Sequence, residues 1–405
     1  MPTPIYLDHA ATTPVRREVR DAMLPFLGEE AFGNPSSAHR FGRQVRSAVE
    51  AARERVAAAV GAEPREVVFT SGGTEADNLA VLGLAAAAAP GGDWSGLHLV
   101  SSPTEHKAVL AALHEAERRG ACVTLLPVDR GGLVELAALD AALAGKLPGG
   151  KPALVSVMWI NNEVGTLQPV GAIAERCRAA GVPFHSDGVQ ALGKVAIDLR
   201  EALCDALAIS AHKIGGPKGT GALIVRGGRR PRPLIHGGSQ QGGVRPGTEN
   251  VAGIVGFGAA AELAAAEQPV KALSLAMMRD ALEAMLRAAV PDAVVHGAGA
   301  PRGPAILNIS APGTDSEAML MHLDLAGVAA ASGSACTTGS IEPSHVLEAM
   351  GVPRELAVAA VRFSVGALSK PEHAALVTER YAKAVEKVRG LRAALGAQRD
   401  LRDLR

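Results

Sequence analysis

Three polar residues, Ser210, His212 and Lys213, follow a short apolar segment of the sequence. The apolar segments 206–209 and 222–225 have the length of strands, and the five glycines and prolines between them require a sharply bent connection. A lysine held at the end of a strand is typical of enzymes whose lysine amine forms a Schiff base with a carbonyl. For this stretch alone, a surface lysine beside a glycine turn is an equal alternative.

A second candidate site lies at the segment 67–78. Residues 67–70 are predicted to form a buried strand that runs into Ser71-Gly-Gly-Thr-Glu75, after which helix-forming residues resume. Free backbone N–H groups and the helix dipole converge at such a turn and bind anions. Gly73 and Thr74 are therefore candidates for binding an anion, and an ordinary strand-to-helix turn is the alternative.

The chain between these two sites alternates strands with helices. Strands are expected at 97–100, 122–126, 153–159 and 182–185, and helices at 107–119, 136–143 and 173–180. Apolar strands separated by amphipathic helices predict an α/β fold with a mostly parallel sheet covered on both faces. Ligands bind beyond the carboxyl ends of the strands in such sheets. The polar residues at five predicted strand ends are Thr74, His106, Asn161 to Glu163, Asp187 with Gln190, and Ser210 with His212 and Lys213.

One motif among these strand ends has a misleading spacing. Residues 188–194 match a nucleotide-binding loop that ends in a lysine, Lys194. The next residue is Val195, which has no hydroxyl group to bind magnesium. We therefore exclude a nucleotide triphosphatase.

The pattern changes after about residue 230. A polar glycine-rich loop at 236–250 precedes an alanine-rich helical region that reaches residue 289, and shorter strands are expected at 306–310, 328–331 and 361–365. Cys336 lies in a loop of serine, threonine and glycine, which suggests an exposed thiol. The other cysteines, Cys122, Cys177 and Cys204, have aliphatic neighbours and are expected to be inert packing residues.

Composition excludes several classes of function. The 41 basic and 41 acidic side chains balance, so no overall basic field favours nucleic acid or a membrane surface as a partner. The four cysteines show no CxxC spacing, and no intrinsic metal site is expected. We expect a cytoplasmic protein, because no secretory signal and no apolar run long enough to cross a bilayer is visible.

Taken together, the motifs resemble those of the cysteine desulfurases of the NifS/IscS type. This family belongs to the class V aminotransferases, which are pyridoxal 5'-phosphate (PLP) enzymes of fold type I. The motifs that carry the resemblance are Tyr6-Leu-Asp-His-Ala-Ala-Thr-Thr-Pro14, Thr70-Ser-Gly-Gly-Thr-Glu75, Thr104-Glu-His-Lys-Ala-Val109, Asn161-Asn-Glu-Val-Gly165, Ser210-Ala-His-Lys213 and Ser332-Gly-Ser-Ala-Cys336.

The resemblance implies the organisation of the chain. Residues 16–260 would form a large cofactor-binding domain with a mostly parallel central sheet. Residues 261–405 would form a smaller α+β domain that carries the cysteine loop at about 331–343, with residues 1–15 packed against it. The family is homodimeric with composite active sites, so Thr248 would reach the phosphate bound by the neighbouring subunit.

The resemblance also assigns roles at the site. Lys213 would hold the cofactor as a Schiff base and later move the α-proton of the substrate. Asp187 would pair with the pyridinium nitrogen, and Cys336 would take the sulfur as a persulfide. His106 would stack on the cofactor ring and act as an acid–base group, and Asn162 and Gln190 would lie on the side of the phenolic oxygen. The substrate carboxylate would be bound by Arg362 together with Asn162. The residues that would bind the phosphate are Gly73, Thr74, Ser210 and His212.

The implied reaction converts L-cysteine to L-alanine and passes sulfur to an acceptor, such as an iron–sulfur scaffold. Cys336 would at most ligate iron of such a cluster transiently. Selenocysteine lyase or another class V aminotransferase-type enzyme is the alternative on the same fold, and a non-catalytic sulfur-relay protein is the alternative of another class. The chain departs from the family pattern at Gln241 and Ala367, which leaves partner docking and loop closure open.

Overall fold

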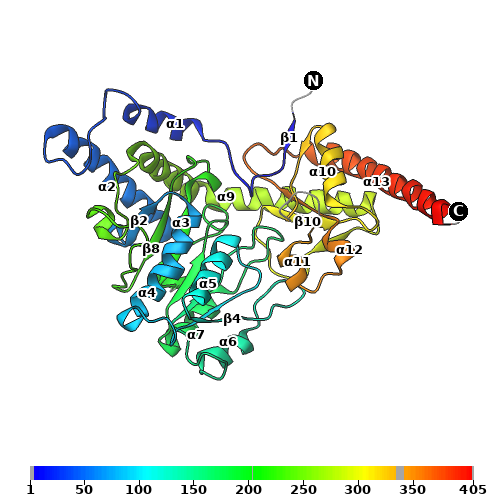
Figure 1. The fold of residues 1–405 in the computed structure, drawn as a ribbon. Coiled ribbons are helices and arrows are strands. Elements are labelled where there is room, and N and C mark those ends of the chain that lie inside the picture. The colour runs from blue at the N-terminus through cyan, green and yellow to red at the C-terminus, as the bar shows by residue number, and fades with distance from the viewer. Residues whose placement is uncertain (1–3, 203, 334–341, 404–405) are drawn as a thin grey trace.

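The structure is a computed structural model that describes residues 4–202, 204–333 and 342–403. Its centre is a seven-stranded sheet in the order β2-β8-β7-β6-β5-β3-β4 (Figure 1). β8 runs antiparallel to both of its neighbours, and the other strands pair in parallel. The mostly parallel sheet predicted from the sequence is thereby confirmed. The strands are β2 (Val67–Thr70), β3 (His98–Ser101), β4 (Cys122–Leu125), β5 (Leu154–Ser156), β6 (Phe184–Asp187), β7 (Ala206–Ser210) and β8 (Gly221–Val225).

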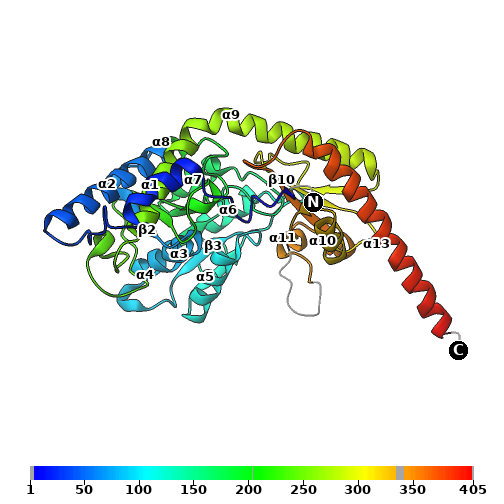
Figure 2. The same cartoon turned by 90° about the horizontal axis from the view of Figure 1, so that it is seen from above.

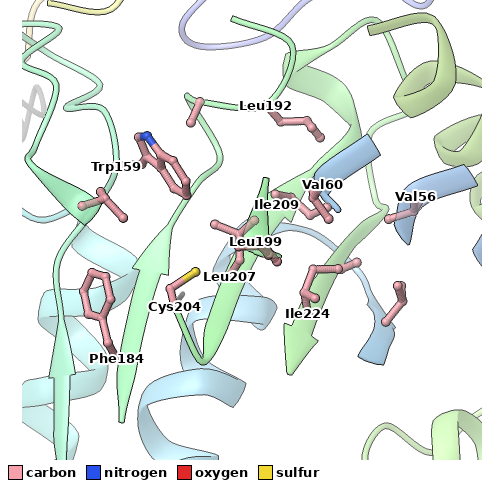
Figure 3. Packing of buried hydrophobic residues seen from close by; sticks show 14 of the residues in the cluster. Val56, Val60, Trp159, Phe184, Leu192, Leu199, Cys204, Leu207, Ile209 and Ile224 are labelled. Atoms are coloured by element: carbon pink, nitrogen blue, oxygen red, sulfur yellow. The ribbon is translucent and has the colours of Figure 1, made fainter. Parts of the chain in front are cut away.

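Helices cover both faces of this sheet, and the strand β7 shows why. Leu207 and Ile209 point to one face, where they join a core with Val56 and Val60 of α2 (Figure 3). Ala206 and Ala208 point to the other face and join the core under α3 and α4. Strands that are buried on both faces must be apolar throughout, which is the pattern of β7. The helices of this part are α1 (Arg17–Met23), α2 (Arg40–Val60), α3 (Gly73–Asn78), α4 (Leu84–Ala88), α5 (Lys107–Arg118), α6 (Leu136–Leu143), α7 (Val170–Ala180) and α8 (Leu199–Ala202).

A smaller unit of helices and antiparallel strands follows the sheet. Its three-stranded sheet has the order β12-β10-β9, and a separate pair joins β1 to β11. The helices α10 to α13 lie around these strands, at the opposite end of the molecule from α1 and α2 (Figure 2). The elements are β1 (Ile5–Tyr6), β9 (Val294–His296), β10 (Ile306–Ser310), β11 (Val328–Ala329), β12 (Ala360–Ser364), α10 (Ser316–Leu325), α11 (His345–Ala349), α12 (Arg354–Ala357) and α13 (His373–Asp403).

The long helix α9 (Val251–Ala289) runs from one part of the molecule to the other (Figure 2). Its first half, with Phe257, packs in the core beneath the seven-stranded sheet. Its second half, with Leu275 and Leu282, packs in the core of the smaller unit, where Ile5 and Leu7 also lie. We propose on this basis that the boundary between a large domain 16–260 and a small domain 261–405 falls within α9, with residues 1–15 packed on the small domain.

Three strands differ by two residues or more from the sequence-based expectation, and one of them, β11, ends at Ala329 instead of residue 331. β5 ends at Ser156 instead of residue 159: Met158 N donates to the side chain of Glu105, although Val157 N and Trp159 N still donate to His185 O and Asp187 O of β6. β6 begins at Phe184 instead of Val182, because Val182 N donates to Cys177 O and so closes α7. Among the described residues, no helix is both long and apolar enough to span a membrane.

Candidate active site

The polar strand ends predicted from the sequence meet in one cavity of about 400 Å³. The cavity lies beyond the carboxyl ends of β2, β6 and β7, where a parallel sheet places its ligands. Ten of the twelve predicted site residues line it: Gly73, Thr74, His106, Asn162, Asp187, Gln190, Ser210, His212, Lys213 and Arg362.

Lys213 is held at the cavity by the N-terminal segment. It ends a short 3₁₀ turn after β7, and its Nζ donates to Ala10 O at 2.6 Å and to Ala11 O at 2.7 Å. Burial, strengthened by the positive charge of Arg362, lowers the pKa of the Lys213 amine to about 8. The amine is thus easily deprotonated and can act as a nucleophile near neutral pH.

Two buried carboxyl groups lie close together in the wall of the cavity. Asp187 is 5% exposed, and Asp77, from α3, is 1% exposed. One ligand atom from each, and one from His106, all lie within 4.8 Å of one another. Burial raises the pKa of Asp187, and burial together with the charge of Asp187 raises the pKa of Asp77 well above its usual value. Buried carboxyl groups with raised pKa values are stabilised in their charged form by a ligand that places a positive charge or a hydrogen-bond donor beside them.

The ring of His106 is fixed by its place at a helix start. His106 caps α5, and its Nδ1 accepts from Ala108 N at 3.1 Å. The neutral ring must therefore carry its proton on Nε2. Burial among the cavity walls lowers the pKa of His106, although the ring can be reached from the cavity. A neutral, flat ring with one N–H can stack on a planar ligand and exchange a proton with it.

One end of the cavity offers donors for a phosphate group. The hydroxyl of Ser210 is buried without a hydrogen-bond partner among the described residues. α3 begins at Gly73, where a Cβ atom would lie 2.7 Å from Val189 Cγ2, so only glycine fits without displacing that side chain. His212 Nδ1 lies 3.1 Å from the hydroxyl of Thr12, which fixes the ring beside these groups.

Arg362 lies in the same cavity with part of its guanidinium unused. One of its terminal nitrogens donates to Asn162 O at 2.9 Å, and the other donates to Asp8 Oδ1 at 2.7 Å. The Nε of Arg362 is buried and has no hydrogen-bond partner among the described residues. The remaining N–H groups can bind a carboxylate, which suits the planar fork of arginine.

The two other predicted site residues do not line this cavity. Cys336 lies outside the described residues. Both described flanks of its loop meet Glu163: Ser344 donates to the Glu163 carboxylate, and Gly333 leaves no room for a Cβ atom beside it. Thr248 is exposed on the glycine-rich loop before α9.

The residues of the cavity fit PLP. The ring nitrogen of PLP is basic, so the buried Asp187 has a partner of the right charge. The unpartnered Ser210 hydroxyl suits a phosphate oxygen, and the Lys213 amine suits an aldehyde. The group formed by Asp77, His106 and Asp187 could also hold a metal ion, but the adjacent amine and phosphate donors favour the organic cofactor.

Sequence reasoning missed four contributors to this site. Asp8 pairs with Arg362, and Ala10 and Ala11 hold Lys213 through their backbone carbonyls. Asp77 was visible in the Thr74-to-Asn78 stretch, yet nothing local indicated that it faces inward. The only local signal was its position three residues after Thr74, on the same side of the helix.

Comparison with known proteins identifies the family of the chain. The family described as Aminotransferase class-V matches residues 5–376. The chain is 44% identical to the cysteine desulfurase IscS of Dictyoglomus turgidum over 385 residues, which cover 95% of each chain. It is 46% identical to the cysteine desulfurase IscS of an Anaeromyxobacter species over 397 residues, with 97% of this chain and 94% of that protein covered.

Solved structures show the same similarity. A NifS-like protein superposes with a TM-score of 0.86 at 33% identity and covers 95% of this chain and 100% of its own. A NifS-like protein from Rickettsia africae gives a TM-score of 0.82 at 32% identity, with 95% of this chain and 99% of that chain covered. The chain therefore belongs to the class V aminotransferase family and, within it, to the cysteine desulfurases.

Proposed function

We propose that this enzyme binds PLP on Lys213, removes the sulfur of L-cysteine and carries it as a persulfide on Cys336. The observation that supports this most strongly is the Lys213 amine, which faces one cavity together with the buried Asp187 and the partly unused Arg362. A nucleophilic amine, an acid for a ring nitrogen and a fork for a carboxylate are what a PLP enzyme needs to process an amino acid.

The cofactor would be held by the residues that line the cavity. Asp187 would face the ring nitrogen, His106 the ring, and Gln190 with Asn162 the phenolic oxygen. Gly73, Thr74, Ser210 and His212 would bind the phosphate group. When bound, PLP supplies an aldehyde that can join an amine and a ring that withdraws electrons from the substrate Cα.

The protein's own groups would then guide the proton and the carboxylate. Arg362 would bind the substrate carboxylate and so orient the Cα–H bond. Lys213 Nζ, once released from the cofactor, is the group placed to take the proton from Cα, because burial keeps its pKa near 8. His106 Nε2–H is available as a second proton donor at the ring face.

Sulfur transfer would fall to Cys336. Its thiolate would attack the substrate sulfur, so that an S–S bond forms while the Cβ–S bond breaks. The electron pair of the broken bond would pass to Cβ, which takes up a proton so that alanine can leave. The product persulfide would remain on the chain for transfer to a sulfur acceptor, such as an iron–sulfur scaffold protein. Cys177 and Cys204 do not suit this role, because burial raises the pKa of each thiol to about 12.

A homodimer would complete the site. The stretch from the end of α1 to the first turn of α2 exposes four large apolar side chains, a feature typical of an interaction surface: Leu24 (54%), Leu27 (67%), Phe32 (64%) and Phe41 (50%). The exposed Thr248 is proposed to reach the phosphate site of the partner subunit. We further propose that the enzyme acts in the cytoplasm, where thiols stay reduced.

The decisive experiment is mass spectrometry of the protein after reconstitution with PLP and incubation with L-cysteine. The expected result is an added sulfur atom on the peptide containing Cys336, with one alanine released per sulfur. Lys213→Ala should abolish both the product and the yellow colour. A cofactor adduct that is still reduced by borohydride in this variant would instead assign the linkage to Lys194 or Lys218.

A further inference from the structure

Lys194, the lysine of the excluded nucleotide loop, is buried behind the cofactor cavity. It is 9% exposed, and its Nζ donates to Gln190 Oε1 at 2.5 Å. Within the described part of the chain, no carboxylate forms an ion pair with it. A buried amine whose hydrogen-bond partner is a neutral amide is unusual, because buried charges are normally paired.

Lys194 is the start of a chain of hydrogen bonds that ends at Lys213. Gln190 Nε2 donates to Ala10 O at 2.9 Å, and the same carbonyl accepts from Lys213 Nζ at 2.6 Å. Because the Ala10 carbonyl can only accept, Gln190 must turn its NH₂ group to Ala10 and therefore its oxygen to Lys194. The second N–H of that NH₂ group is left for the cavity that Gln190 lines.

We propose that Lys194 is a positioning residue that fixes the Gln190 carboxamide and, through the Ala10 carbonyl, the Lys213 amine. This inference rests on the function proposed above, in which Gln190 faces the phenolic oxygen of the cofactor. A donor on Oε1 also polarises the amide, so the N–H that Gln190 offers to the cavity becomes a stronger donor.

The groups around Lys194 leave it without a counter-charge. It borders a second cavity of about 390 Å³, and Lys213 lines both cavities. The only acid lining this second cavity among the described residues, Glu267, already pairs with Arg16 at 2.6 Å. Burial and the neighbouring cations lower the pKa of Lys194 to about 7. The titratable or charged groups that face Lys194 are His9, Arg16, Lys213, Glu267, Lys271 and Arg362.

His9 cannot supply the missing negative charge, because an imidazole is either neutral or positive. Both of its ring nitrogens are buried without a hydrogen-bond partner among the described residues, and burial lowers its pKa to about 4. The ring is therefore neutral at working pH and cannot balance or replace the Lys194 amine. The direct link from Lys194 to the site runs through Gln190.

The test uses the holoenzymes of Lys194→Met, Gln190→Met and the double variant. The quantity compared is the midpoint pH at which the yellow cofactor linkage on Lys213 loses its proton. Loss of the donor should raise this midpoint in Lys194→Met by about one pH unit, which corresponds to one hydrogen bond to a charged group. The affinity for PLP should fall about tenfold. Lys194→Arg, which keeps the donor and the charge, should restore most of both values.

Lys271→Met is the matched control. It removes a lysine from the wall of the same second cavity but breaks no hydrogen bond to Gln190. Its midpoint should shift by less than a third of the shift in Lys194→Met. Thermal unfolding of each variant shows whether a change reflects damage to the fold.

The double variant decides the mechanism. If Lys194 acts through Gln190, Lys194→Met should add almost nothing in the Gln190→Met background. Additive shifts, or a failure of Lys194→Arg to rescue, would overturn the inference. The pH dependence of Lys213 acetylation in the apoprotein allows the same comparison of variants without cofactor. If the wild type showed no yellow colour, the proposed function would be contradicted, but the effect of Lys194 on the Lys213 amine could still be measured.

Discussion

Replacing Arg362 by lysine tests the site most directly, because it keeps the charge and removes the fork. The guanidinium of Arg362 holds Asn162 O and Asp8 at fixed positions and still has its buried Nε–H free. A lysine has all of its donors on a single atom and cannot reach these two acceptors and a substrate carboxylate together. We expect Arg362→Lys to form the yellow holoenzyme normally and to lose much of its activity with cysteine.

The size of the loss follows from the hydrogen bonds at stake. A hydrogen bond to a charged group contributes about 1.5–3 kcal/mol, and the lysine forfeits about one of them to the carboxylate. At about 1.4 kcal/mol for each factor of ten, kcat/KM should fall by about 10- to 150-fold. The small exposure of Arg362, 7%, supports the upper part of this range, because water cannot replace the lost donor easily.

The assay compares L-cysteine with cysteamine, which lacks the carboxylate. Each is mixed with the holoenzyme, and its binding is followed by the change in the cofactor's absorbance. The wild type should prefer cysteine strongly, and Arg362→Lys should lose most of that preference while binding cysteamine as before. A variant that loses both ligands equally would show that Arg362 holds Asp8 and Asn162 in place and does not touch the substrate. Asp8→Asn is the control, since it keeps an acceptor for Arg362.

Three other outcomes are expected. The rate at which apoprotein and PLP form the yellow holoenzyme should rise with pH and level off above about 8, because only the unprotonated Lys213 amine attacks the aldehyde. Stopped-flow absorbance measures this rate, and a rate that does not change with pH would contradict the expectation. Cys336→Ser should bind PLP and cysteine but release no alanine, whereas Cys177→Ser should retain turnover in an alanine assay. Inactive Lys213→Ala and Thr248→Val dimers, once mixed, should regain about a quarter of wild-type activity, because half of the dimers become hybrids with one intact site. No recovery despite subunit exchange would place each site within one chain.

The strand ends were predictable from the sequence for a physical reason. A buried parallel strand is mostly apolar, so a polar residue near its end marks the carboxyl edge of the sheet. This reasoning located Lys213 just after β7 and Asp187 at the carboxyl end of β6, although Asp187 is the last residue of β6 and His185 and Ser186 within that strand are polar too. The same reasoning predicted a longer β5 than the structure has. Met158 N donates to the side chain of Glu105, and no local sequence pattern indicates that contact.

The N-terminal part of the site could not be predicted in this way. Ala10 and Lys213 are 203 residues apart, and the contact between them uses a backbone carbonyl that every residue type possesses. Asp77 posed a different difficulty: an aspartate in a helix normally faces water, and only the packing of α3 against the sheet turns this one inward. The motif at residues 6–14 supported the family resemblance, but its physical role, which is to contact Lys213 and Arg362, is evident only in the folded structure.

The distribution of charge in the cavity constrains the ligand beyond what any single residue does. The carboxyl groups of Asp77 and Asp187 lie together in one wall, so that wall requires a cation or a proton donor. Arg362 offers free N–H groups elsewhere in the same cavity, and the Ser210 hydroxyl and the start of α3 offer neutral donors. A simple carboxylic acid would add no positive charge beside Asp187, which already accepts from Val189 N, or beside Asp77, whose carboxylate lies 3.7 Å from His185 Nε2. A simple amine would leave the Nε of Arg362 without an acceptor. A protonated aromatic nitrogen, a phosphate and an amino-acid carboxylate satisfy all three regions together, because each then meets its complementary group. The distribution of charge therefore supports the proposal that a cofactor and an amino acid bind in this cavity together.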